Sequence, residues 1–216
     1  MIPQKEIEFL VRFICESDAI ESITNDPTFV RTQLENDQAR GHVGAMLHLR
    51  ECVKHKVLLS PHLIKQTQSL IVREQAEKGE RAIATRHLGN WRDCNVSVSG
   101  RMCAGHQDVS ALMLMLMEKL AHFQSIWSEL LAIERVAAIA RFHYEYLQIH
   151  PFVDGNGRSA RALSYYLYRF AGLTPFVFTA NDRHETYYRC FDNPMDMIEY
   201  FHDRTILVTR EKAPHE

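Results

Sequence analysis

Apolar residues recur at three- and four-residue spacing along most of the chain, a pattern typical of amphipathic helices. The first such segment covers residues 3–22, where Ile7, Leu10, Ile14 and Ile20 fall on one helical face. Start and stop signals such as Asp26 before Pro27 divide the rest into further segments. Helices are predicted over about 38–56, from Ser60 to Gly79, from Asp108 or Ser110 through 111–123, and over 128–149, 158–171, 182–192 and 194–210.

Residues 128–149 are apolar on nearly all sides, so we expect them to form the central helix of a bundle. A stripe of methionines is expected to fill the core: Met113, Met115 and Met117. Residues 86–106 differ, because glycines interrupt them and the segment from Val96 to Ser99 alternates with period two, which predicts a short hairpin. We therefore predict one all-α domain over residues 1–216, a helical bundle with a small β-hairpin.

Composition narrows the class of protein. The 216 residues are 46% apolar, enough for one domain with a sizeable core. With 25 Lys and Arg against 27 Asp and Glu, the net charge of −2 leaves no electrostatic footprint for nucleic acid. We find no apolar run long enough for a membrane span and no signal peptide at the start. Five scattered cysteines without a Cys-x-x-Cys pair indicate buried, reduced thiols, so a cytoplasmic protein without nucleic-acid or membrane partners is expected.

The segment 150–161, His-Pro-Phe-Val-Asp-Gly-Asn-Gly-Arg-Ser-Ala-Arg, gathers chemistry between two predicted helices. The turn Gly155-Asn156-Gly157 lets backbone N–H groups face a ligand, and the helix that starts there adds its positive end. Arg158 and Arg161 follow three residues apart, against the preference of a helix start for acids. A bound anion would compensate for the two positive charges, and a polyphosphate is the ligand we expect.

Two further side chains suit reactions at a phosphate. Asp154 is a hard oxygen ligand beside the phosphate turn, the usual arrangement for Mg²⁺ shared between one carboxylate and phosphate oxygens. His150 ends the preceding helix, and its unperturbed pKa near 7 suits a general base. Each of these residues alone is common in proteins without such a site, so the prediction rests on their convergence within twelve residues.

At this point the sequence resembles a family. His-x-Phe-x-Asp/Glu-Gly-Asn-Gly-Arg-x-x-Arg is the signature of Fic-domain proteins of the Fido superfamily, and 150–161 fits every specified position. Trp91-Arg92 followed by Val96 and Val98 is similar to the family's flap hairpin over 86–106. Tyr187 and Tyr188 lie where the family's nucleotide pocket often carries paired tyrosines, after a one-residue adjustment of spacing.

The resemblance implies a protein adenylyltransferase, which moves AMP from ATP, with Mg²⁺, to a Ser, Thr or Tyr hydroxyl of a target protein. It implies that His150 deprotonates that hydroxyl and that Asp154 holds Mg²⁺. Residues 128–172 would then be a catalytic helix–loop–helix. The nucleotide would be bound by Gly155, Asn156, Gly157, Arg158, Arg161, Tyr187 and Tyr188.

The family also implies a target-binding edge and an inhibitor. The flap, with Val96, Val98 and Gly100, would pair with a target segment as an added strand. Common flaps carry prolines where Cys103-Ala104 stand, which concerns the identity of the target. Residues 1–24 resemble an inhibitory helix with the motif Ser/Thr-x-x-x-Glu-Gly/Asn: Ser17 and Glu21 match, and Ser22 departs. In that form the glutamate pairs with the second arginine, here Arg161.

Other interpretations remain open at this stage. The same site could remove AMP, with Glu21 activating water, or transfer UMP or phosphocholine. A metal-dependent hydrolase would use His143, His150 and Asp154 as ligands, and a third alternative is a module that binds nucleotide without catalysis. Because many relatives form dimers, the resemblance also allows a homodimer. The target protein is not indicated by any residue pattern.

Overall fold

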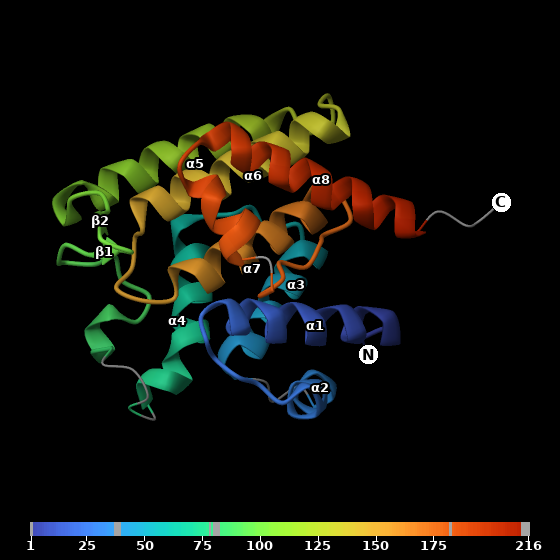
Figure 1. Cartoon of the computed structure of the whole chain (residues 1–216), viewed down its shortest axis with the longest axis horizontal. Coiled ribbons are helices and arrows are strands. Elements are labelled where there is room, and N and C mark those ends of the chain that lie inside the picture. Colours follow the sequence, from blue (N-terminus) through green and yellow to red (C-terminus); the bar gives the residue numbers. More distant parts are fainter. Residues whose placement is uncertain (1, 37–39, 78, 80–82, 182, 213–216) are drawn as a thin grey trace.

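The computed structural model describes residues 2–36, 40–77, 79, 83–181 and 183–212, with side chains to residue 209. Helices dominate it, as predicted, and a two-stranded antiparallel hairpin is added at one side (Figure 1). The α-helices are α1 (Gln4–Ile20), α2 (Pro27–Glu35), α3 (Gly41–Lys54), α4 (Pro61–Glu77), α5 (Val109–Ser125), α6 (Ala132–Ile149), α7 (Asn156–Phe170) and α8 (Pro194–Lys212). Short turns of 3₁₀ or π type are η1 (Thr85–His87), η2 (His106–Asp108), η3 (Arg183–Tyr187) and η4 (Tyr188–Phe191).

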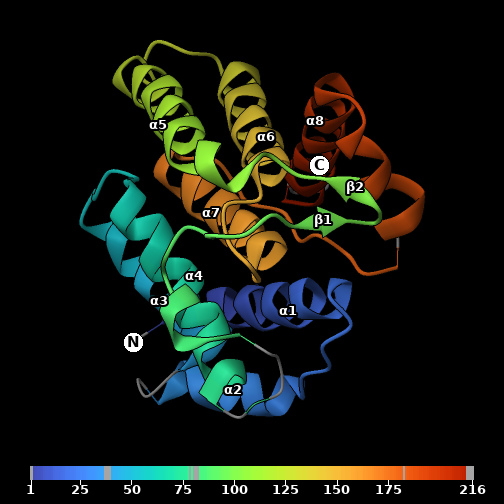
Figure 2. The ribbon, with the colours of Figure 1, turned by 90° about the vertical axis from the view of Figure 1, so that its left-hand side faces the viewer.

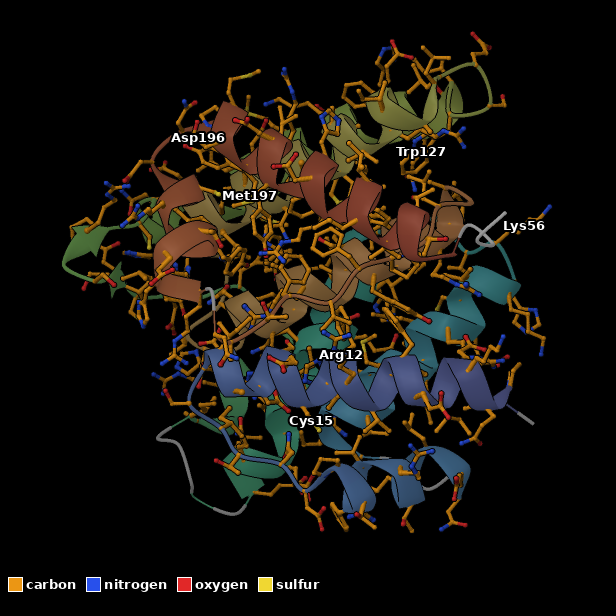
Figure 3. All side chains as sticks on the ribbon, turned by 45° about the vertical axis from the view of Figure 1, so that its right-hand side comes forward. Arg12, Cys15, Lys56, Trp127, Asp196 and Met197 are labelled. Carbon is orange, nitrogen blue, oxygen red and sulfur yellow. The ribbon has the colours of Figure 1, made fainter. Side chains whose placement is uncertain are left out.

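Helix α7 is the centre of the bundle. In Figure 1 it runs between α5, α6 and α8 on one side and α1 to α4 on the other, and Figure 2 shows the same order from a second direction. All its residues from Arg158 to Tyr168 are buried. Figure 3 shows side chains filling the space between α8 and α1, with Met197 directed inward and Asp196 on the outer surface.

The prediction that residues 128–149 form the central helix was wrong. Helix α6 begins only at Ala132, because the Glu134 carboxylate accepts a hydrogen bond from the Leu131 N–H at 2.8 Å and fixes the start there. Its first turn is exposed, including Ile133. Small residues such as Ala160 and Ala162 let neighbouring helices approach α7 from all sides, and apolar content alone does not reveal this.

Several local predictions also need correction. Met113 and Met117 are buried, but Met115 is exposed, because residues two apart fall on different faces of a helix. Of the five cysteines predicted to be buried, Cys52 and Cys190 are buried, Cys15 and Cys103 are partly buried, and Cys94 is exposed. The predicted helix over 182–192 is a π turn followed by a 3₁₀ turn, and residue 182 lies outside the described residues. The first residues of the predicted helix over 38–56 likewise lie outside them.

The hairpin is short and exposed. Strands β1 (Ser97–Val98) and β2 (Arg101–Met102) pair in the register Ser97↔Met102 and Val98↔Arg101. Between them, Ser99 and Gly100 both take positive φ, at 50° and 79°, as a two-residue hairpin turn requires. Both strands are exposed, so their outer edges are accessible. No helix in the described part of the chain is long and apolar enough to cross a membrane.

Candidate active site

A cleft of about 460 Å³ opens beside the α6–α7 connection. Four separate parts of the chain contribute to its walls: the hairpin, the loop 150–157, the turns η3 and η4, and Glu21, which directly follows α1. The predicted site residues that line it are Glu21, Val98, His150, Asp154, Gly155, Asn156, Gly157, Arg161, Tyr187 and Tyr188. Val96, Gly100, Ser17 and Arg158 are not among the lining residues.

The loop between α6 and α7 is held from within. The Asn156 side chain closes a reciprocal pair with Phe152, accepting from its N–H and donating to its carbonyl, both at 2.9 Å. Phe152 is fully buried against the Trp91 ring, with centroids 4.9 Å apart. Gly155 has φ of 80° and lies against Val72, so a side chain there would meet both strain and a clash. Asn156 is therefore a structural anchor, and the glycines leave the cleft side of the loop open.

His150 presents a neutral imidazole to the cleft. It closes α6 in a left-handed conformation, with φ of 52°, and its ring shares a hydrogen bond with the Leu147 carbonyl. Burial lowers its pKa, opposed by that carbonyl and by the carboxylates of Glu21 and Asp154, and the nearby Arg92 cation lowers it further. With one nitrogen donating to Leu147, the other is left as an acceptor, as a general base requires.

Asp154 places one carboxylate at the edge of the cleft. Its Oδ1 atom accepts from the Gly155 N–H at 2.5 Å and lies 3.6 Å from Nη2 of Arg158. Its backbone carbonyl accepts from Gln68 on α4 at 3.0 Å, which fixes the residue from behind. A single carboxylate beside an anion-binding loop fits Mg²⁺, which takes one or two protein carboxylates and draws its other ligands from phosphate and water.

The two arginines of the motif diverge. Arg158 is buried and donates from Nη1 to Oε1 of Gln75 on α4 at 2.7 Å, and it does not line the cleft. Arg161 lines the cleft and reaches the end of α1. The prediction that both arginines reach one face of the site thus describes Arg161 alone in this structure.

Arg161 is held by the last turn of α1. Its Nε donates to the Ser17 hydroxyl and its Nη2 to the Ser17 carbonyl, each at 2.9 Å. The same Nη2 lies 2.9 Å from Oε1 of Glu21. A Cβ added at Gly157 would overlap that Oε1 atom, so the Glu21 carboxylate lies directly over the anion-binding turn. An anion already occupies the place where the loop and Arg161 together attract one.

Ser22, the departure from the inhibitory motif, has a physical explanation. It follows the end of α1 with φ of 61°, the left-handed conformation in which helices commonly end. Glycine and asparagine adopt this conformation most readily, which accounts for their place in the motif. Ser22 therefore keeps the geometry of that motif at a cost in backbone strain.

A buried chain of hydrogen bonds fixes Arg161 from its other side. The Ser164 hydroxyl donates to the Ala160 carbonyl at 2.9 Å, so it can only accept from Nδ1 of His143, 2.8 Å away. Nε2 of His143 is then an acceptor for the Tyr187 hydroxyl at 2.8 Å, and that oxygen accepts from Arg161. Burial lowers the pKa of His143 to about 3, so this ring stays neutral.

His143 therefore connects Ser164 to Tyr187 through hydrogen bonds and is not a metal ligand. Both its nitrogens are engaged, and the described residues contain no group of three His, Cys, Asp or Glu side chains that could hold a metal ion. The hydrolase interpretation, with His143, His150 and Asp154 as ligands, has no geometric basis. The sequence signal for this role was the position of His143 on the buried face of α6. That position alone does not identify the hydrogen-bond partners of the ring.

Residues 58–168, more than half of the chain, match the family model described as the Fic/DOC family. The chain belongs to the Fic/DOC family. Its Fic domain includes α4, the hairpin, α5, α6, the loop 150–157 and most of α7.

Curated relatives carry the same family name. A protein adenylyltransferase Fic of Nematostella vectensis is 29% identical over 193 residues, which cover 83% of this chain and 42% of the relative. The protein adenylyltransferase Fic of Culex quinquefasciatus is 38% identical over 99 residues, covering 46% of this chain and 19% of the relative. This chain spans less than half the length of these relatives.

Solved structures share the fold. A Fic domain containing signaling protein from Bacteroides thetaiotaomicron has a TM-score of 0.74 at 18% identity, covering 93% of this chain and 85% of the other. Fic-1 from C. elegans has a TM-score of 0.69 at 17% identity, covering 96% and 63%. BepC from Bartonella tribocorum, solved with AMPPNP bound, has a TM-score of 0.51 at 19% identity, covering 83% and 87%.

The sequence analysis did not identify two arginines as functional residues: Arg92, within the matched residues 58–168, and Arg183, which follows them. Arg183 in η3 donates from Nη1 to the carbonyls of Ala19 and Ile20, at 2.8 and 3.2 Å, and so binds the C-terminal end of α1. Arg92, noted above only as part of the flap pattern, is buried beneath the hairpin. No periodicity or spacing marks either one, because both act on backbone carbonyls distant in sequence.

Proposed function

We propose that this Fic domain is a protein adenylyltransferase that moves AMP from ATP to a Ser, Thr or Tyr hydroxyl of a target protein. The observation that carries the proposal is the convergence, in one cleft, of a neutral, partly buried imidazole, an anion-binding turn, a carboxylate and an arginine. The names of the curated relatives support the same reaction, and the AMPPNP bound to BepC supports an adenine nucleotide as the ligand.

In this proposal the His150 ring nitrogen that faces the cleft takes the proton from the target hydroxyl. The oxygen forms a bond to the α-phosphorus of ATP as the bond to the β-phosphate oxygen breaks, and pyrophosphate leaves. A partly buried, neutral imidazole is a suitable proton acceptor, since it needs no prior deprotonation at pH 7. The remaining residues of the site would position the phosphates and stabilise their negative charge, as is usual for phosphoryl transfer.

The phosphates of ATP would lie over Gly155, Asn156 and Gly157, with Arg161 at the far end. Mg²⁺, held by Asp154, would neutralise charge on the phosphate oxygens. The adenosine would lie toward Tyr187 and Tyr188, of which Tyr188 is the more exposed. A phosphate contact for Arg158 stays a prediction, because its side chain here donates to Gln75.

Glu21 supports a regulatory extension of the proposal. Its carboxylate lies over Gly157 and pairs with Arg161, so phosphates that bind there must displace it. We infer that α1 inhibits transfer by repelling the terminal phosphates and withholding the guanidinium. Removal of the carboxylate then frees the phosphate end of the cleft.

The exposed hairpin supports a binding edge for the target. Unpaired backbone groups along its outer edge can accept an extended segment as an added strand. Val98, which lines the cleft, would contact the residue next to the modified hydroxyl. Action in the cytoplasm and a homodimeric state are further predictions, to be measured by cell fractionation and by size-exclusion chromatography with light scattering.

Labelled ATP tests the reaction. The parent chain and the Glu21→Gly variant are incubated with Mg²⁺ and with α-labelled or γ-labelled ATP, alone and with a cell extract as the source of targets. Label on protein from the α position supports AMP transfer, and label from the γ position supports phosphate transfer instead. Release of AMP from a modified protein supports the reverse reaction, and nucleotide binding with no label and no release supports a non-catalytic module.

A further inference from the structure

The Arg92 side chain lies between the hairpin and the end of α6, and it contacts both through backbone carbonyls only. It is buried, and within the described part of the chain no carboxylate forms an ion pair with it. A buried cation without a counter-ion is expensive unless dipoles solvate it. The positions of the carbonyls around Arg92 therefore indicate which segments of the chain its guanidinium holds together.

Three consecutive carbonyls at the end of α6 accept hydrogen bonds from Arg92. Its Nη2 donates to Ile149 at 3.2 Å, its Nε to His150 at 2.8 Å, and its backbone N–H to Pro151 at 2.9 Å. The last carbonyls of a helix lack partners within the helix and carry its negative end, so a guanidinium there is favourable. His150 is thus held, in its left-handed conformation, by a contact to its own backbone.

The other side of the same guanidinium holds the base of the hairpin. Nη1 donates to the Cys94 carbonyl at 2.8 Å, and Nη2 donates to the Ala104 carbonyl. In the register of the hairpin these two carbonyls lie at opposite legs, just before β1 and just after β2. One planar, rigid group therefore joins both legs of the flap to the residue that carries the imidazole.

We propose that Arg92 is a positioning residue for the transfer reaction, which sets the flap and His150 in one fixed mutual geometry. The inference rests on the proposed function, because a target hydroxyl presented along the flap must meet the imidazole. Arg92 does not line the cleft, so it does not touch nucleotide or target there. A misplacement of about 1 Å between the reacting groups costs roughly 100-fold in rate.

Two substitutions separate geometry from charge. Arg92→Lys keeps the cation but loses the planar fork, and Arg92→Gln loses the cation. Both are made in the Glu21→Gly background, which removes the α1 carboxylate from all arms alike. The matched control is Arg86→Lys in the same segment, an exposed arginine with its Nε atom 3.6 Å from Asp93. Among the described residues, its side chain forms no hydrogen bond to β1, β2 or α6.

For Arg92→Lys we expect a 10- to 100-fold lower kcat for labelling from α-labelled ATP. The Kd for ATP should stay within about twofold of its background, and Arg86→Lys should match the background in both measurements. An unchanged kcat in a folded Arg92→Lys protein overturns the proposal. So does a loss of nucleotide affinity equal to the loss of rate, since that indicates a merely structural role.

A titration of His150 keeps the test independent of any reaction. The groups that face the ring are Arg92, Glu21 on α1 and Asp154 in the loop, and Arg92 is the cation among them. Removal of the charge in Arg92→Gln should raise the pKa of His150, read by NMR of labelled histidine, whereas Arg92→Lys should leave it near the background value. Identical titrations in all three proteins overturn the inference. An absence of labelling by the background protein with the expected titrations contradicts the proposed function alone.

Discussion

The Glu21 carboxylate and the Arg161 guanidinium, 140 positions apart in the chain, meet at 2.9 Å over the anion-binding turn. The contact joins the end of α1 to the first turns of α7, the most buried helix. Arg161 also binds Ser17 and Tyr187, so the guanidinium is held on several sides, and its contacts Glu21 and Tyr187 both line the cleft. In the proposed function, a phosphate of ATP would compete with the Glu21 carboxylate for this guanidinium.

Glu21→Gly should increase transfer from ATP, because it removes the anion that lies over Gly157. We expect a rise of at least tenfold in label incorporated from α-labelled ATP, which corresponds to about 1.4 kcal/mol. Glu8→Gly is the control, since it removes an exposed carboxylate from the same helix and loosens the helix without reaching the cleft. Equal activation by both variants would indicate general loosening of α1, and no activation by Glu21→Gly would contradict inhibition.

Ser22→Gly should strengthen inhibition. Glycine adopts the φ of 61° without the steric cost that serine bears, so the docked end of α1 should gain about 1 kcal/mol. The expected result is a higher free energy of unfolding in urea together with a lower transfer rate. Lys56→Gly is a matched control, because Lys56 also has positive φ, at 52°, and lies on the side of the molecule away from the hairpin (Figure 3). It should gain stability at unchanged activity; a similar fall in activity would contradict the prediction.

His150→Ala, in the Glu21→Gly background, should lower the transfer rate about 10²- to 10⁴-fold, the usual effect of losing a general base. ATP affinity should hardly change. Because burial lowers the pKa of His150, the ring is neutral above that pKa, and the rate of the parent should fall only below pH 6.5. His62→Ala, on the exposed face of α4, serves as control. A rate that already falls between pH 8 and 7 would exclude this histidine as the base.

His143→Gln should make the protein less sensitive to acid. Burial lowers the pKa of His143 to about 3, so below pH 6.5 the unfolded chain takes up a proton that the folded one does not. This proton costs up to about 1.4 kcal/mol of stability per pH unit between pH 6.5 and 3. Urea unfolding at pH 7 and 4.5 should show a smaller difference in the variant. The control is His62→Gln, which replaces an exposed histidine. If the loss of unfolding free energy from pH 7 to 4.5 is as large in His143→Gln as in His62→Gln, the burial of a neutral His143 ring is contradicted.

The sequence alone predicted the helical class and the hairpin, which the structure confirms, and it predicted an anion-binding loop over residues 150–161. These follow from interactions among near neighbours: the spacing of apolar residues, the caps, and a turn whose glycines and adjoining helix start form an anion site. Tertiary structure decided that α7 and not α6 is central, that Arg158 faces Gln75 while Arg161 faces the cleft, and that Arg92 joins the flap to His150. Local hydrogen bonds and periodicity act over a few residues, whereas these contacts depend on how helices far apart in the chain pack, and no short pattern encodes that.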